Sequence, residues 1–286
     1  MAALAALISS GPGARPAHPP DAVAALASVP AGAARASAAT RPLLGAPYVR
    51  SALGEGTGPD ADPRFRLDAF DCLGFLETAI ALGSSRSLDE AARALDDVRY
   101  QGAPALGARN HEVQAQWLPA NLEKGWLVDL TRPLAGARAV PAPIEFTPER
   151  WRALRAAGRA IDGLPVSREP VGAFELWAVP ADELAALGPQ IPDGTAIVVV
   201  REDQPSRCTR VSHVGLVVAG PSGERSVRHA TASHGAGQGR VVEEPLAVFV
   251  ARQRRARPAW PLVGFALFGL PDASARVAAL VAADPT

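Results

Sequence analysis

This 286-residue chain has few of the residues that mark several common protein classes. It contains two cysteines, Cys72 and Cys208, too few for a disulfide framework, and a structural zinc site would need histidines as well. Lysine occurs once, at Lys124, and the 29 basic residues balance 29 acidic ones, so there is no basic excess to attract nucleic acid. No apolar run approaches the roughly 20 residues that span a bilayer. These absences exclude a disulfide-stapled module and disfavour nucleic-acid binding and a membrane span.

The first 40 residues lack the apolar content of a core. They are mostly Ala, Pro, Gly and Ser, which predicts a disordered or processed lead over residues 1–40. The short apolar start, Met1 to Ile8, lacks the basic n-region of a typical secretory signal. It is compatible with the remnant of a secretory signal and equally with an Ala-rich terminus of no function.

The rest of the chain separates into helical and strand-forming parts. We expect one domain over 41–275, with a mainly helical and loop-rich insertion at about 85–190, and a tail at 276–286. The apolar, β-branched runs that predict strands are Thr195–Val200, Val211–Val218, Ser226–Ala230, Arg240–Glu244 and Val263–Leu270. Helices followed by strands are typical of an α+β fold with an antiparallel sheet.

Cys72 stands at the start of a predicted helix. Asp71 precedes it and can cap exposed backbone amides, apolar residues follow at helical spacing, and Gly83 can end the helix. A helix start favours negative charge, so we expect it to lower the pKa of the thiol toward neutrality. The sequence therefore predicts a reactive cysteine. Cys208, in a polar loop without a helix start, is interpreted as an incidental thiol.

Two histidines in the strand region could complete a site for nucleophilic catalysis. A thiol needs a base to take its proton, and that base needs a third group to orient it. His213 fits the base and His229 the orienting group, because both would lie on a hairpin that turns around Pro221–Gly223. His234, in the following small-residue segment, is the alternative to His229. A zinc site made of Cys72, His213 and His229 is a further alternative, ranked below a free thiolate.

Polar residues between the two regions are candidates for substrate contacts. Arg109, Asn110 and His111, with Trp117 nearby, could line a sugar or peptide-carboxylate subsite, because arginine binds carboxylates through two parallel hydrogen bonds. The same residue types also form capped structural loops. Asp71 could bind a substrate amino group or simply cap the helix.

These motifs resemble the NlpC/P60 superfamily of papain-like cell-wall hydrolases, and within it the DUF1460 amidase-like family. The resemblance covers roughly residues 42 to 270 in one order. The segments that carry it are Leu44-Gly-Ala-Pro-Tyr48-Val, Phe70-Asp-Cys-Leu-Gly-Phe-Leu-Glu77, Val98-Arg-Tyr100, Arg109-Asn-His111 with Trp117 and Asn121, Asp129-Leu-Thr131, Pro192-Asp-Gly194, Val211-Ser-His213-Val-Gly and Arg228-His229-Ala230.

The resemblance implies a papain-like α+β fold in which the nucleophile helix packs on an antiparallel sheet. It implies cleavage of the amide between N-acetylmuramic acid and L-alanine in peptidoglycan or muropeptides. Cys72 would be the nucleophile, His213 the base and His229 the orienting residue, while Tyr48 would lie near the oxyanion. No metal or organic cofactor is implied.

The same resemblance leaves other functions and the location open. One alternative is a γ-D-glutamyl endopeptidase of stem peptides, and another is a non-catalytic module that binds wall fragments. We expect the cell envelope, periplasmic or secreted, if the lead is a signal, and the cytoplasm if it is not. The oligomeric state is not predicted.

Overall fold

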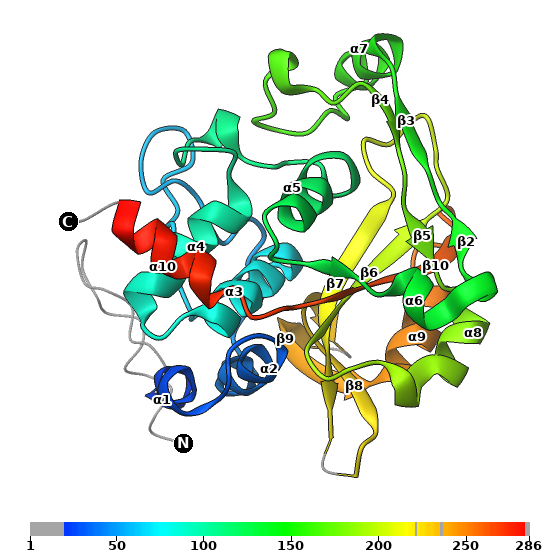
Figure 1. Ribbon diagram of the computed structural model, residues 1–286. Helices are drawn as coiled ribbons and strands as arrows, with labels where there is room; N and C mark the ends of the chain where they lie inside the picture. The colour runs from blue at the N-terminus through cyan, green and yellow to red at the C-terminus, as the bar shows by residue number, and fades with distance from the viewer. Residues whose placement is uncertain (1–19, 221, 235–236, 284–286) are drawn as a thin grey trace.

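A six-stranded antiparallel sheet forms the centre of the computed structural model, which describes residues 20–220, 222–234 and 237–283. The strand order is β1-β10-β6-β7-β8-β9, with every neighbouring pair antiparallel (Figure 1). The strands are β1 Val128–Asp129, β6 Thr195–Arg201, β7 Val211–Ala219, β8 Arg225–His234, β9 Gly237–Pro245 and β10 Leu262–Gly269. The predicted antiparallel sheet of an α+β fold is confirmed, including the closing strand near the C-terminus.

Each face of this sheet is covered by helices. Alternate residues of β6 show this: Val198 and Val200 belong to one apolar cluster, and Ile197 and Val199 belong to the other. Because successive strand side chains point to opposite faces, a strand buried on both faces has a continuous apolar sequence. The uninterrupted apolar sequence of β6 therefore reflects burial of the strand on both faces, between two layers of helices.

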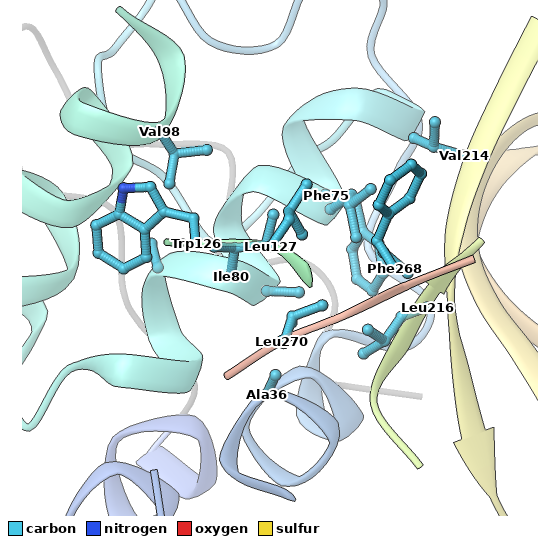
Figure 2. Packing of buried hydrophobic residues seen from close by; sticks show 14 of the residues in the cluster. Ala36, Phe75, Ile80, Val98, Trp126, Leu127, Val214, Leu216, Phe268 and Leu270 are labelled. Atoms are coloured by element: carbon cyan, nitrogen blue, oxygen red, sulfur yellow. The ribbon is translucent and has the colours of Figure 1, made fainter. Parts of the chain in front are cut away.

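The first face carries α3, Cys72–Ser84, which is packed between α2, Ala33–Thr40, and α4, Leu88–Arg99. Figure 2 shows Phe75 of α3 directed toward Val214 and Leu216 of the sheet. Each of these three side chains is at most 2% exposed, so the helix is fixed against β7 by apolar burial.

The opposite face carries α8, Ala181–Leu187, and α9, Leu246–Arg255. The sequence did not lead us to expect α9, although its buried residues Leu246, Phe249, Val250 and Gln253 have the spacing of a helix face. Helices and strands therefore alternate at the C-terminal end of the chain.

The segment expected as a helical insertion also contains strands. Its remaining helices are α5 Leu118–Glu123, α6 Thr131–Ala135 and α7 Pro148–Ala156, and its remaining strands are β2 Val140–Pro141, β3 Ile144–Phe146, β4 Gly172–Phe174 and β5 Trp177–Ala178. Short helical turns lie at Arg41–Leu43, Leu106–Ala108, Val113–Trp117, Gly136–Arg138, Val166–Arg168 and Gly188–Gln190. The segment is joined to the main layers, because α4 packs on α3 and β1 pairs with β10.

The prediction of a disordered lead up to residue 40 is wrong for residues 20–40. These form α1, Pro20–Ser28, and α2, and α2 packs on α3, with Ala36 and Ala39 fully buried. Small side chains allow this close approach: a Cβ placed on Gly83 would lie 3.1 Å from that of Ala36. Residues 1–19, and with them the proposed signal, lie outside the described part.

The expected tail begins with a helix as well. Helix α10, Ser274–Ala283, packs beside α4, and Arg276 forms hydrogen bonds to Asp97 at 2.6 and 3.0 Å. Among the described residues no helix is both long and apolar enough to cross a bilayer.

Candidate active site

Cys72 is the first residue of α3, and its neighbour Asp71 fixes the helix start. One oxygen of Asp71 accepts a hydrogen bond from the amide of Gly74 at 2.7 Å, and the other accepts from the amide of Ser51 at 3.1 Å. The predicted capping role of Asp71 is thus confirmed. A substrate amine would compete with these two amides for the same carboxylate.

Cys72 is partly buried and lines a cavity of about 360 Å³. The cavity collects residues from the Tyr48 loop, from α3, from strands β7 and β8, and from the end of α9. Its lining residues are Tyr48, Cys72, Ser212, His213, Thr231, Ala232, Arg252, Gln253, Ala256 and Arg257. The predicted nucleophile, the predicted base and Tyr48 therefore share one cavity.

The two histidines of the hairpin are in direct contact. Nε2 of His213 lies 2.8 Å from Nδ1 of His229, and their ring planes are nearly perpendicular at 88°. His229 is completely buried. Gly215 makes room for this pair, because a Cβ at that position would lie 3.0 Å from the Cβ of His229. His229 therefore contacts the predicted base directly, whereas the side chain of His234 lies outside the described residues.

Two residues that the sequence did not indicate continue this contact chain. Nε2 of His229 lies 3.2 Å from Oε1 of Glu244 and 2.9 Å from a terminal nitrogen of Arg252, which also donates to Glu244. Burial opposes ionisation of Glu244, but the hydrogen bonds from His229 and Arg252 outweigh it and lower the pKa of its carboxyl. A carboxylate is therefore held behind the histidine pair.

The contacts from His213 through His229 to Glu244 can set the tautomer of His213, the predicted base. Arg252 can only donate, so its contact with Nε2 of His229 is a hydrogen bond only when that nitrogen is unprotonated. In the other tautomer, in which His229 donates its Nε2–H to Glu244, Nδ1 of His229 must accept a hydrogen bond from Nε2–H of His213. The other ring nitrogen of His213, Nδ1, is then unprotonated and free to accept a proton. His213 and Cys72 line the same cavity, and no hydrogen bond joins them within the described part of the chain.

The ionisation of the thiol differs from our expectation. Desolvation raises the pKa of Cys72 to about 12, and Asp71 adds to the rise, whereas backbone amides of Val214, Leu73 and Cys72 itself act in the opposite direction. The prediction that the helix start lowers the pKa of the thiol toward neutrality is therefore wrong, because burial outweighs the helix terminus. Burial also holds the pKa of His213 well below its ordinary range, with contributions from His229 and Arg252. The resting pair is a neutral thiol and a neutral imidazole.

Comparison with known proteins gives this arrangement a family. Residues 38–256 match the model of the AmiA-like family, described as N-acetylmuramoyl-L-alanine amidase-like. The chain belongs to this family. The match includes Cys72, His213, His229, Glu244 and Arg252. A search of curated proteins found no match.

Solved structures show the same fold as this AmiA-like chain. A Legionella pneumophila protein of family DUF1460 has 23% identity and a TM-score of 0.67, over 83% of this chain and 87% of that one. A Bacteroides uniformis N-acetylmuramoyl-L-alanine amidase has 19% identity and a TM-score of 0.59, over 80% of this chain and 94% of that one. Identities this low show a shared fold.

Several of the predicted substrate residues of the AmiA-like chain lie in a neighbouring cavity of about 470 Å³. Asp71, Arg109, Asn110 and His111 line it, on another side of the α3 start than Cys72. Arg109 is already engaged, because it forms ion pairs with Glu55 at 2.5 Å and Asp60 at 2.8 Å. The guanidinium of Arg109 is therefore a structural clamp in this state.

Trp117 does not line either of these two cavities. Its side chain is completely buried, and its indole N–H donates to Glu77 at 2.9 Å. The prediction that Trp117 contacts substrate is wrong, since the ring is part of the core beside α3. His111 is also partly engaged, with Nε2 2.8 Å from the carbonyl of Leu106.

Three residues near the AmiA-like site were missed from the sequence, namely Glu244, Arg252 and Arg257. Glu244 ends a predicted strand, and finding it required the register in which it lies opposite Val227, two residues from His229. Arg252 and Arg257 depend on α9, whose apolar spacing was a usable signal. Among the described residues, no cluster of three or more His, Cys, Asp and Glu side chains is placed to hold a metal ion.

Proposed function

We propose that this protein hydrolyses the amide between N-acetylmuramic acid and L-alanine in cell-wall fragments, with Cys72 as nucleophile in a papain-like NlpC/P60 arrangement. Membership of an amidase-like family supports the reaction class. The observation that carries the proposal is the shared cavity of Cys72 and His213, in which His229 occupies only one nitrogen of the base.

In the first step the sulfur of Cys72 attacks the lactyl carbonyl carbon while Nδ1 of His213 takes the thiol proton. Because both groups rest neutral, proton transfer accompanies attack instead of preceding it. The carbonyl oxygen becomes an oxyanion, and the backbone amide of Cys72 and the hydroxyl of Tyr48 are its donors. Burial and then the nearby Cys72 raise the pKa of Tyr48, so its hydroxyl keeps the proton it would donate.

Collapse of the oxyanion breaks the C–N bond. The proton on His213 passes to the leaving nitrogen, the peptide departs with a free amine, and a thioester remains on Cys72. His213 then takes a proton from water, whose oxygen attacks the thioester carbonyl. As this second tetrahedral adduct collapses, the C–S bond breaks, the proton on His213 returns to the sulfur of Cys72, and the muramic acid carboxyl group is released. Each step that charges His213 is stabilised by Glu244 through His229.

The proposal includes an extracytoplasmic place of action, where peptidoglycan and muropeptides are found. No metal or cofactor takes part in the steps above. Cleavage at a γ-D-glutamyl bond would use the same cysteine and histidines, so product identity separates the two reactions.

The test is incubation with N-acetylmuramoyl peptides and mass spectrometry of the products. We expect free muramic acid derivatives and peptides that begin with L-alanine. Cys72→Ala should lower the rate by about a thousandfold or more, because the covalent step is lost. Cys208→Ala, which removes the other thiol of the chain, is the comparison and should retain far more activity than Cys72→Ala. Intact substrate with the wild-type enzyme, or full activity of Cys72→Ala, would overturn the proposal, and cleavage after D-glutamate would favour the endopeptidase.

A further inference from the structure

A second cavity, of about 690 Å³, adjoins the one that contains Cys72. The two share Ser212 and Arg257 as lining residues. The other residues of the second cavity come from α7's C-terminal side, from the loop before β7 and from the turn after α9: Arg159, Gln204, Ser206, Arg207, Cys208, Thr209, Val211, Ala259 and Trp260.

The charged residues of this second cavity are all arginines. Among the described residues that line the two cavities, none is Asp or Glu. The guanidinium groups of Arg159 and Arg257 make no hydrogen bond or ion pair within the described chain. Arg207 binds the neutral side chain of Gln204 at 2.9 Å and lies 4.1 Å from the ring centre of Trp260. No carboxylate among the lining residues therefore neutralises the positive charge of these arginines.

Arg257, at the junction of the cavities, has an unfavourable backbone. Its φ is +55°, in the left-handed region, and it precedes Pro258, which disfavours helical conformations for the residue before it. The conformation is held by buried Arg201, which donates to the carbonyls of Ala256 and Trp260 at 3.0 Å each. Strained residues that are held in place by their surroundings are found at binding sites, where the strain fixes a functional side chain.

The field of Arg257 also extends to the reacting groups. Its positive charge partly offsets the rise in the pKa of Tyr48 and adds a minor contribution to the lowered pKa of His213. A ligand group held by Arg257 is therefore near the groups that act on the scissile amide.

We propose that the arginine-lined cavity binds a free carboxylate on the peptide side of the substrate, with Arg257 as its principal contact. The inference rests on the proposed function, since it places a peptide next to the amide that Cys72 attacks. A guanidinium with unsatisfied donors can bind a carboxylate through two parallel hydrogen bonds. Arg159 and Arg207 add positive charge, and the absence of acidic lining residues in the described chain avoids repulsion.

The test compares two ligands that differ in the two carboxylates of the glutamate residue: N-acetylmuramoyl-L-alanyl-D-glutamate and its D-glutamic diamide counterpart, in which carboxamides replace both carboxylates. Dissociation constants are measured by calorimetry with the Cys72→Ala protein, so that the ligand is not consumed. We expect the acid to bind about 10- to 100-fold more tightly than the amide, which is the range for a charged hydrogen bond. Arg257→Gln in the same background should reduce this preference to near unity and leave amide binding within about twofold.

Arg255→Gln is the matched control, because Arg255 is an exposed arginine of α9 that lines neither cavity. It should keep the preference for the acid. Arg257→Gly provides a second variant that removes the charge and suits the left-handed backbone. Equal binding of both ligands, or a preference that survives in both Arg257 variants, would overturn the inference. A wild-type enzyme that binds the acid preferentially but cleaves neither ligand would refute the proposed function and leave this site standing.

Discussion

Replacement of Glu244 by glutamine tests whether the carboxylate behind the histidine pair positions the base. The residue is 7% exposed and its side chain keeps its shape in Glu244→Gln, so the fold should be retained. Loss of a charge-assisted hydrogen bond to His229 costs about 1.5–3 kcal/mol. If the charged form of His213 depends on that bond, kcat should fall about 10- to 100-fold. The glutamine amide can also donate to Nε2 of His229, which would favour the tautomer of His213 with the proton on Nδ1.

Two measurements separate this role from a structural one. In the pH profile of kcat/KM, the acid limb should move to lower pH, because Arg252 would then lower the pKa of His213 without an opposing carboxylate. Nitrogen-15 chemical shifts of the imidazoles should show the proton of His213 moving from Nε2 toward Nδ1. Glu243→Gln is the control, because Glu243 pairs with Arg228 at 2.6 Å and does not contact either histidine in any described interaction.

The reasoning would be refuted by a Glu244→Gln enzyme with kcat within about twofold of wild type and an unmoved acid limb. If Glu244→Gln lost no more activity than Glu243→Gln, the role of Glu244 would be structural and not that of positioning the base.

The residues in and around the cavity of Cys72 give three further kinds of measurable effect, on stability, on kcat and on pH dependence. Arg257→Gly should raise the free energy of unfolding by about 1 kcal/mol, because glycine tolerates φ of +55°, and a lower melting temperature would contradict this. Gly215→Ala should lower kcat by about tenfold or more in a folded protein, because its Cβ would displace His229; unchanged kcat would show that β8 adapts. Alkylation of Cys72 by iodoacetamide should rise about tenfold per pH unit above neutrality, whereas a plateau by pH 7 would reveal a resting thiolate. The acid limb of wild-type kcat/KM should lie below the ordinary histidine pKa, since burial keeps His213 neutral. Because the pKa of His213 is lower in the folded than in the unfolded protein, the unfolded state binds the proton at higher pH. The free energy of unfolding should therefore decrease as the pH falls below about 6.5.

The central features of the site could be predicted because they depend on local patterns. A capping Asp71, a thiol at the next residue and helical apolar spacing specify the position of Cys72 without any long-range information. Apolar strands likewise located His213 and His229, and a short hairpin brought them together. These signals are contained within about ten residues each.

The parts that failed depend on tertiary contacts. Whether Glu244 faces His229 is decided by the register of β8 and β9, and a shift of one residue would turn it to the other face. The pKa of Cys72 depends on how much protein surrounds the sulfur, which no local pattern reports. Residues 33–40 looked disordered because alanine contributes little apolar area, yet small side chains are what permit α2 to lie against Gly83.

The enclosure of α3 has a consequence for how relatives of this protein can diverge. The helix is packed against α2, α4, β7 and β8, so changes along its length would disturb several layers at once. The turn at 256–260 and the loop at 204–209 border the cavities but lie outside that packing. Substitutions in these two segments can therefore change the lining of the cavities without disturbing the packing that holds Cys72 at the start of α3.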